Sequence, residues 1–181
     1  MAKFYDTVRW SHLAASALRL GYPSKHLAIG LMVHSSPRMV RVRGGVSTPR
    51  TATAGILAGD SQANTFAKSV LYYVINAVHL QRPTAGPCTY VDDLAQACRG
   101  PDSSKVVQEL ALAGLMLYED LTSIGCSISP KSMKVASTLK LTKRLVKVFR
   151  ANNLSLGYDT NVRDVGISNT AGKVRSAGLI S

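Results

Sequence analysis

Two long amphipathic segments flank a short acidic one, and this order constrains the fold more than any other feature. Residues 61–80 carry apolar side chains at steps of three and four, which predicts a helix. Residues 104–124 repeat that pattern, with Ser103 or Ser104 as the predicted N-cap. Between them, "CTYVDDLAQAC" has the composition of two strands joined by an acidic turn. The order predicts an α+β fold, with one small antiparallel sheet covered by helices on one face.

Shorter elements are predicted on both sides of this unit. Residues 10–20 and about 24–34 predict two helices. The stretch "RMVRVRGG", residues 38–45, alternates apolar and basic side chains and predicts a strand followed by a Gly-Gly turn. Residues from about 139 to 151 predict a basic helix whose cations lie mostly on one side. These cations are Lys140, Lys143, Arg144, Lys147 and Arg150.

The charge balance restricts the partners. The 181 residues include 22 Lys and Arg against 10 Asp and Glu, a formal net charge of +12. An excess of this size indicates a polyanion, nucleic acid before membrane, although a surplus of charge can also serve solubility alone. The sequence has neither a signal peptide nor an apolar stretch of about 18 residues that could cross a bilayer. We therefore expect an intracellular protein, nuclear or cytoplasmic, that is not secreted.

The cysteines and histidines do not have the spacing of a metal site. Three widely spaced cysteines, an odd number, predict a reducing compartment and no disulfide framework. They are Cys88, Cys98 and Cys126. The four histidines, expected at the surface or at an interface, are His12, His26, His34 and His79.

The acidic turn carries the candidate chemistry in two adjacent carboxylates, Asp92 and Asp93. Two-metal phosphoryl transfer uses carboxylates that converge on one point, and Mg²⁺ prefers a few carboxylates together with substrate phosphates. A pair at a hairpin tip suits Mg²⁺ or Mn²⁺ in this way. A solvated turn is the simpler alternative, because acidic residues are common in turns.

Five boxes in order resemble those of reverse transcriptases, the RNA-directed DNA polymerases of retroelements. The stretch "TYVDDLA" resembles their Tyr-x-Asp-Asp box, motif C, and "TAGILAGDSQANTFAKSVLYYVI" resembles the loop and helix of motif B. Downstream, "LTSIGCSISPKSMKV" resembles motif D and "RDVGIS" is similar to the motif E hairpin. At the start, "MAKFYDTV" resembles the second half of motif A. The order and spacing agree across nearly the whole chain, and this agreement carries the resemblance.

The resemblance implies a partial reverse transcriptase domain over residues 1–181. Its fold would be a polymerase palm, a small antiparallel sheet with the "YVDD" hairpin backed by helices. The fingers and most of the thumb would be absent, and the connection from palm to thumb would start after about residue 139. The implied reaction is attack of a primer 3′-hydroxyl on the α-phosphorus of a deoxynucleoside triphosphate, directed by an RNA template and helped by two Mg²⁺.

The resemblance also implies site residues, position by position. Asp92 and Asp93 match the catalytic, metal-binding carboxylates. Tyr5 matches a bulky residue that excludes a 2′-hydroxyl. The residues expected near the incoming nucleotide are Tyr5, Gly59 and Lys131. Those expected near the template and primer are Tyr90 and Gly55, together with Arg41 and Arg43, which the predicted strand before motif B would offer to template phosphates.

Three departures from the family pattern bear on activity. The catalytic Asp of motif A would lie one position before Met1. Motif B has Ala58 and Ala63 where the family usually has Gln and Ser, and Ser132 stands at the motif D lysine position. We therefore expect the isolated chain to have little or no polymerase activity.

Two other functions stay open. A viral RNA-dependent RNA polymerase palm has the same sheet and metal chemistry, although its motif C usually begins with Gly and it lacks a bulky residue at the Tyr5 position. A non-catalytic retroelement remnant would only bind nucleic acid, through the +12 charge. In either case, the basic face of residues 139–151 is a solvated helix surface or a contact to the phosphate backbone.

Overall fold

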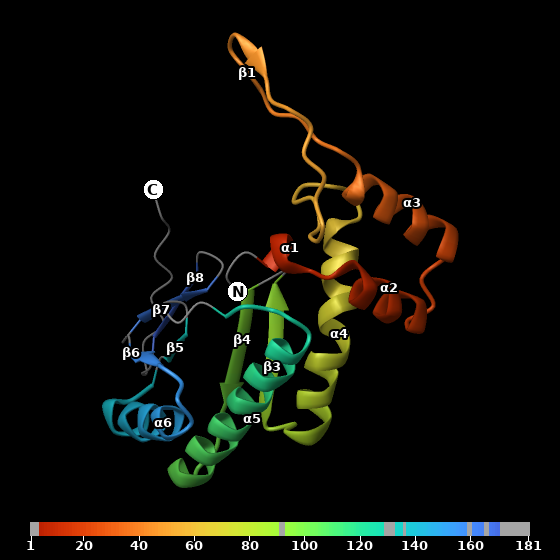
Figure 1. Ribbon diagram of the computed structural model, residues 1–181. Helices are drawn as coiled ribbons and strands as arrows, with labels where there is room; N and C mark the ends of the chain where they lie inside the picture. The colour runs from red at the N-terminus through yellow and green to blue at the C-terminus, as the bar shows by residue number, and fades with distance from the viewer. Residues whose placement is uncertain are drawn as a thin grey trace.

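The predicted α+β class is confirmed. The computed structural model describes residues 4–90, 93–128, 133–135, 137–158, 161–164 and 167–170, and helices and strands alternate along them (Figure 1). The helices are α1 (Phe4–Thr7), α2 (Trp10–Arg19), α3 (Ser24–Ser35), α4 (Ala63–Gln81), α5 (Ser103–Ser123) and α6 (Leu139–Ala151). The strands are β1 (Arg41–Val42), β2 (Gly45–Val46), β3 (Ala85–Tyr90), β4 (Asp93–Cys98), β5 (Lys134–Val135), β6 (Gly157–Tyr158), β7 (Asn161–Asp164) and β8 (Ile167–Thr170).

The acidic hairpin is present as predicted. β3 and β4 pair antiparallel from Ala85 opposite Cys98 to Tyr90 opposite Asp93. The two residues that connect the strands, 91–92, lie outside the described part of the chain. α4 packs against β3, and α5 packs against both strands and against α4. The two long helices that were predicted behind the hairpin are therefore confirmed.

The single antiparallel sheet is not observed. Throughout the described residues the strands pair two by two, as β1–β2, β3–β4, β5–β6 and β7–β8. The β5–β6 pair is parallel, and the other three pairs are antiparallel. Four of these strands are only two residues long, which is too short to extend the β3–β4 ladder. The expectation that the hairpin lies inside a larger sheet is wrong for this part of the chain.

The main core forms around α4, because its apolar residues recur at helical steps and share one face. Phe66 and Val78 are fully buried in it. The other buried apolar residues of α4 are Ala63, Ala67, Val70, Leu71 and Val74. Leu13 and Ala17 from α2 and Leu117 and Leu121 from α5 complete the same cluster. One apolar helix thereby joins α2, α5 and the hairpin.

The predicted N-cap of α5 is wrong. The N-cap of α5 is Asp102, whose Oδ1 accepts hydrogen bonds from the backbone N–H groups of Ser104 at 2.8 Å and Lys105 at 3.3 Å. A carboxylate suits this position because it pairs with otherwise unbonded N–H groups and with the positive end of the helix dipole. α3 begins after Pro23, without a side-chain cap.

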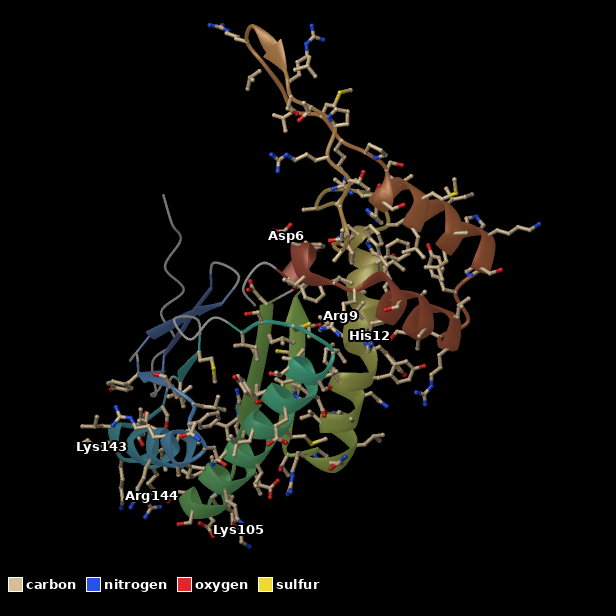
Figure 2. The ribbon with its side chains drawn as sticks, in the orientation of Figure 1. Asp6, Arg9, His12, Lys105, Lys143 and Arg144 are labelled. Carbon is tan, nitrogen blue, oxygen red and sulfur yellow. The ribbon has the colours of Figure 1, made fainter. Side chains whose placement is uncertain are left out.

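α6 covers the free side of α5 and forms a second, smaller core. Leu145 and Phe149 are buried there against Val107 and Ala111 of α5 and Val135 of β5. The helix has the predicted bounds, and its cations are exposed as predicted. Figure 2 shows Lys143 on the outer side of α6 and Arg144 towards the N-terminal end of α5. No helix among the described residues is long and apolar enough to cross a membrane.

The three cysteine thiols are free and differ in exposure. Cys88 lies on the outer face of β3, whereas Cys126 is buried in the main core. Burial disfavours the charged thiolate and raises the pKa of Cys126 to about 11. Burial, and then the nearby Glu109 carboxylate, also raise the pKa of Cys98. Neither thiol is therefore poised as a nucleophile.

Candidate functional site

Asp93 lies at the turn end, or tip, of the β3–β4 hairpin, where its side chain is exposed. The next residue, Leu94, packs against the main core. Because successive side chains of a strand point to opposite faces, an inward Leu94 directs Asp93 outward. Asp92 precedes it in the connection and lies outside the described residues. The backbone of Tyr90 ends β3, and its side chain also lies outside what the structure describes.

The donor chemistry at this end suits a hard cation. The Asp93 carboxylate makes no hydrogen bond or ion pair with another described residue. The part of the chain that the structure describes contains no group of three His, Cys, Asp or Glu that could hold a metal ion. Mg²⁺ is commonly held by one or two carboxylates together with substrate phosphates rather than by a closed protein cage. The adjacent Asp92 and Asp93 fit that kind of site.

The structure brings Tyr5 and Gly55 into direct contact. The backbone N–H of Gly55 donates to the Val8 carbonyl at 2.8 Å, and the N–H of Ile56 donates to the Tyr5 carbonyl at 2.6 Å. Gly55 has a φ of 100°, and a Cβ there would lie 2.9 Å from the Tyr5 oxygen. Only glycine fits this position without strain. We call this contact between residues 5–8 and 55–56 the Tyr5–Gly55 junction.

Two side chains brace the junction. The Tyr5 hydroxyl donates to Oδ1 of Asn64 on α4 at 3.2 Å. The Trp10 Nε1–H donates to the Gly55 carbonyl at 2.7 Å, so Trp10 anchors this loop. Asp6 lies beside Tyr5 but is exposed, and Figure 2 shows it on the outer side of α1. In Figure 1, α1 and hence the junction lie towards the turn end of the β3–β4 hairpin.

The expectation that every histidine lies at a surface or interface is wrong for His34. It is fully buried, its Nδ1 accepts a hydrogen bond from the Leu57 N–H at 3.0 Å, and its ring meets Phe66 edge-on with 5.6 Å between centroids. Burial lowers the pKa of His34, and the Arg38 charge lowers it further, while Asp60 opposes the shift. The sequence held a signal for this, because His34 lies seven positions after Leu27 on the buried face of α3.

The remaining predicted residues are spread over the molecule. Gly59 is exposed in the turn before α4, with a φ of 87° and open space where a Cβ would lie. Arg41 and Arg43 belong to a projecting segment that leads away from the β3–β4 hairpin in Figure 1. Lys131 lies outside the described residues. The structure therefore joins Tyr5 to Gly55 but does not gather every predicted residue in one place.

The exposed face of α6 is a second candidate surface for phosphate. A hollow of about 440 Å³ runs along it and is lined by Leu139, Thr142, Lys143, Val146, Lys147, Arg150 and Tyr158. Its cations make no ion pair with a described carboxylate, since the salt bridge found in this part of the chain is Arg82 with Glu109. Arg144 also donates to the Ser104 hydroxyl at 3.1 Å. Such a surface suits contact with a polyanion.

No protein-family model, curated protein or solved structure matches this chain. The resemblance of the five boxes to reverse transcriptases therefore stays a prediction. The functional proposal depends on the residues and their arrangement.

The Tyr5–Gly55 junction predicts that two glycines of the same loop differ in their tolerance of a side chain. Gly59→Ala should lower the free energy of unfolding by about 1 kcal/mol, the strain of a positive φ. Gly55→Ala should lower it by about 3 kcal/mol, because the added Cβ also collides with the Tyr5 carbonyl. Urea unfolding of both variants measures the difference. Equal losses would contradict the close backbone contact.

The buried His34 predicts a stability that depends on pH. Its folded pKa lies below the ordinary value of about 6.5, so the unfolded chain takes up the proton first as the pH falls. The free energy of unfolding should therefore decrease from about pH 7.5 to about pH 5.5. His34→Asn, which keeps an acceptor for the Leu57 N–H but does not titrate, should flatten this dependence.

Chemical denaturation across that pH range measures the effect. The matched control is His26→Asn, at an exposed position of α3, which should retain the slope of the parent chain. An unchanged slope in His34→Asn would contradict a buried neutral imidazole.

Proposed function

We propose that this chain is the palm portion of an RNA-directed DNA polymerase, in which Asp92 and Asp93 bind Mg²⁺ at the tip of the β3–β4 hairpin. The observation that carries the proposal is the hairpin itself. Its strands are joined by a connection of only two residues, and Asp93 faces outward at its end with no described partner. Two amphipathic helices, α4 and α5, pack against it.

The supporting helices hold β4, and with it Asp93, in place. Leu94 and Cys98 of β4 pack against the core that contains Phe66 of α4 and Leu117 of α5. Functional groups on packed elements are held more accurately than groups on loops. When bound, Mg²⁺ would neutralise the two carboxylates and polarise the transferred phosphate. The contribution of the chain is to hold Asp93, the neighbour of Asp92 in sequence, exposed at the end of a packed strand.

The Tyr5–Gly55 junction supports a nucleotide site near that tip. The tyrosine is held from both ends, by its backbone carbonyl at Ile56 and by its hydroxyl at Asn64. A ring fixed in this way is suited to exclude a 2′-hydroxyl by its bulk, which is the role that the resemblance implies. This would select deoxynucleotides. The template and primer would contribute the polyanion that the +12 charge favours.

The proposal predicts that Mn²⁺, used as a paramagnetic substitute for Mg²⁺, binds at the hairpin tip. In ¹⁵N-labelled chain, low concentrations of Mn²⁺ should broaden the backbone amide signals of Asp93 and Leu94 before those of the rest of the chain. Asp92→Asn combined with Asp93→Asn should abolish this selective broadening, because the remaining amide oxygens are much weaker ligands for a hard cation.

The matched control removes another adjacent acidic pair, Glu119 and Asp120 of α5. Glu119→Gln combined with Asp120→Asn makes the same change in charge and should leave the broadening at the tip unchanged. Equal broadening at both pairs, or none at the tip, would overturn the metal site. Nucleic-acid binding that persists without metal binding would favour a non-catalytic remnant.

A further inference from the structure

Residues 36–50 form an arm that projects from the body of the protein. The arm leaves the end of α3, turns through β1 and β2, and returns towards α4 (Figure 1). Arg41 pairs with Val46 and Val42 with Gly45, and Gly44 makes the turn with a φ of 90°. Every residue of the arm is exposed except the half-buried Arg38. The strand predicted at 38–43 is thus a short ribbon outside the core.

The arm has no core of its own. Met39 is 60% exposed, Val40 65% and Val42 67%. A hairpin of two strands is only marginally stable in water without a surface to pack against. At the base of the arm, Arg38 and Arg50 face each other and exchange two backbone hydrogen bonds of 2.9 Å. Like charges directly opposite each other destabilise a strand pair. The free arm therefore lacks both apolar contacts and counter-charge.

The charge of the arm is of one sign. The sequence contains no Asp or Glu between Asp6 and Asp60. Arg41, Arg43 and Arg50 are exposed, and their guanidinium groups make no hydrogen bond or ion pair with another described residue. The Arg38 guanidinium donates to the His34 carbonyl at the end of α3, which fixes the base of the arm to the body. The arm therefore exposes three arginines beside exposed valines, and its base is attached to the body of the protein.

The positive charge of the arm indicates which kind of partner it binds. A second copy of the arm would bring its own arginines against these, and like charges in contact are unfavourable. An anionic partner would supply the negative charge that the arm lacks. The major groove of B-form DNA, about 12 Å wide, admits a two-stranded β-ribbon. The major groove of A-form RNA is deep and too narrow for side chains to read. Duplex DNA therefore offers phosphates for the arginines and apolar thymine methyl groups for the valines.

We propose that the arm of residues 36–50 is a duplex-DNA-binding element that enters the major groove, with Arg41, Arg43 and Arg50 on the phosphates and base edges. This goes beyond the proposed polymerase function. It requires neither Asp92 and Asp93 nor a divalent metal, and the arm projects away from the hairpin that carries those residues. The arm would hold a DNA duplex separately from the site that holds nucleotide and primer.

The test compares two triple variants of the full chain by fluorescence anisotropy with a labelled DNA duplex of about 20 base pairs. Arg41→Gln, Arg43→Gln and Arg50→Gln together should weaken binding at least about tenfold. They should also reduce the slope of log K against log salt by up to about three, about one for each arginine that contacts a phosphate. The matched control, Lys25→Gln, Lys68→Gln and Lys105→Gln, removes the same charge from exposed positions of α3, α4 and α5. It should change affinity less than about threefold.

Three further measurements identify the partner and the groove. Duplex RNA of the same sequence should bind more weakly than DNA and lose little affinity in the arm variant. The parent chain should protect guanine N7, which lies in the major groove, from dimethyl sulfate, and the arm variant should not. The arm variant should retain the selective Mn²⁺ broadening at Asp93 and Leu94, so that a failure of the metal site can be distinguished from a failure of the arm.

The proposal is overturned by any of four results. Equal losses of DNA affinity in the two triple variants would mean that binding depends only on the net charge of the chain. Equal losses on DNA and RNA, or the absence of N7 protection, would exclude the major groove. Finally, sedimentation could show that the free chain is a dimer and that the arm variant is a monomer. This result would mean that the arm binds a second copy of the chain rather than DNA.

Discussion

Burial of the apolar face of α4 is the interaction on which the rest of the structure depends. Phe66 and Val78 are fully buried, and this one helix packs against α2, α5 and β3. Burying a large apolar side chain stabilises a fold by about 1.5–3 kcal/mol, so the seven buried apolar residues of α4 outweigh any single hydrogen bond in the chain. The same helix also bonds the Tyr5 hydroxyl through Asn64. Core and candidate site therefore share one scaffold.

This arrangement divides the molecule into a packed part and a free part. The β3–β4 hairpin contributes Leu94, and the Tyr5–Gly55 junction contributes Val8 and Ile56, to the main core or its edge. Asp93, through its neighbour Leu94, and Tyr5 are thus held by the same core. The arm of residues 36–50 contributes nothing to that core. Its base is fixed to α3 through Arg38, whereas its β1–β2 ribbon packs on no part of the core. Such a segment is suited to pack against a binding partner.

Periodicity predicted the helices and the hairpin because each is determined by residues near in sequence. The face of α4, the exposed cations of α6 and the β3–β4 pair all follow from local steps of three, four or two. The contacts that fix the site join distant residues, such as Tyr5 with Ile56 and His34 with Leu57, and no local pattern shows them. The cap of α5 was misassigned because Asp102, Ser103 and Ser104 are all good N-caps, and only geometry separates them.

Native-state hydrogen exchange tests the central claim, that α4 organises one cooperative core from which the arm is excluded. The amides of Val70, Val74 and Val78 should exchange slowest, together with those of Leu117 and Leu121 in α5, through global unfolding. The amides of Gly55 and Ile56 at the junction should be protected as well. Those of Val42 and Val46 in the arm should exchange at least about a hundredfold faster. Exchange of α4 at the rate of the arm would contradict the account.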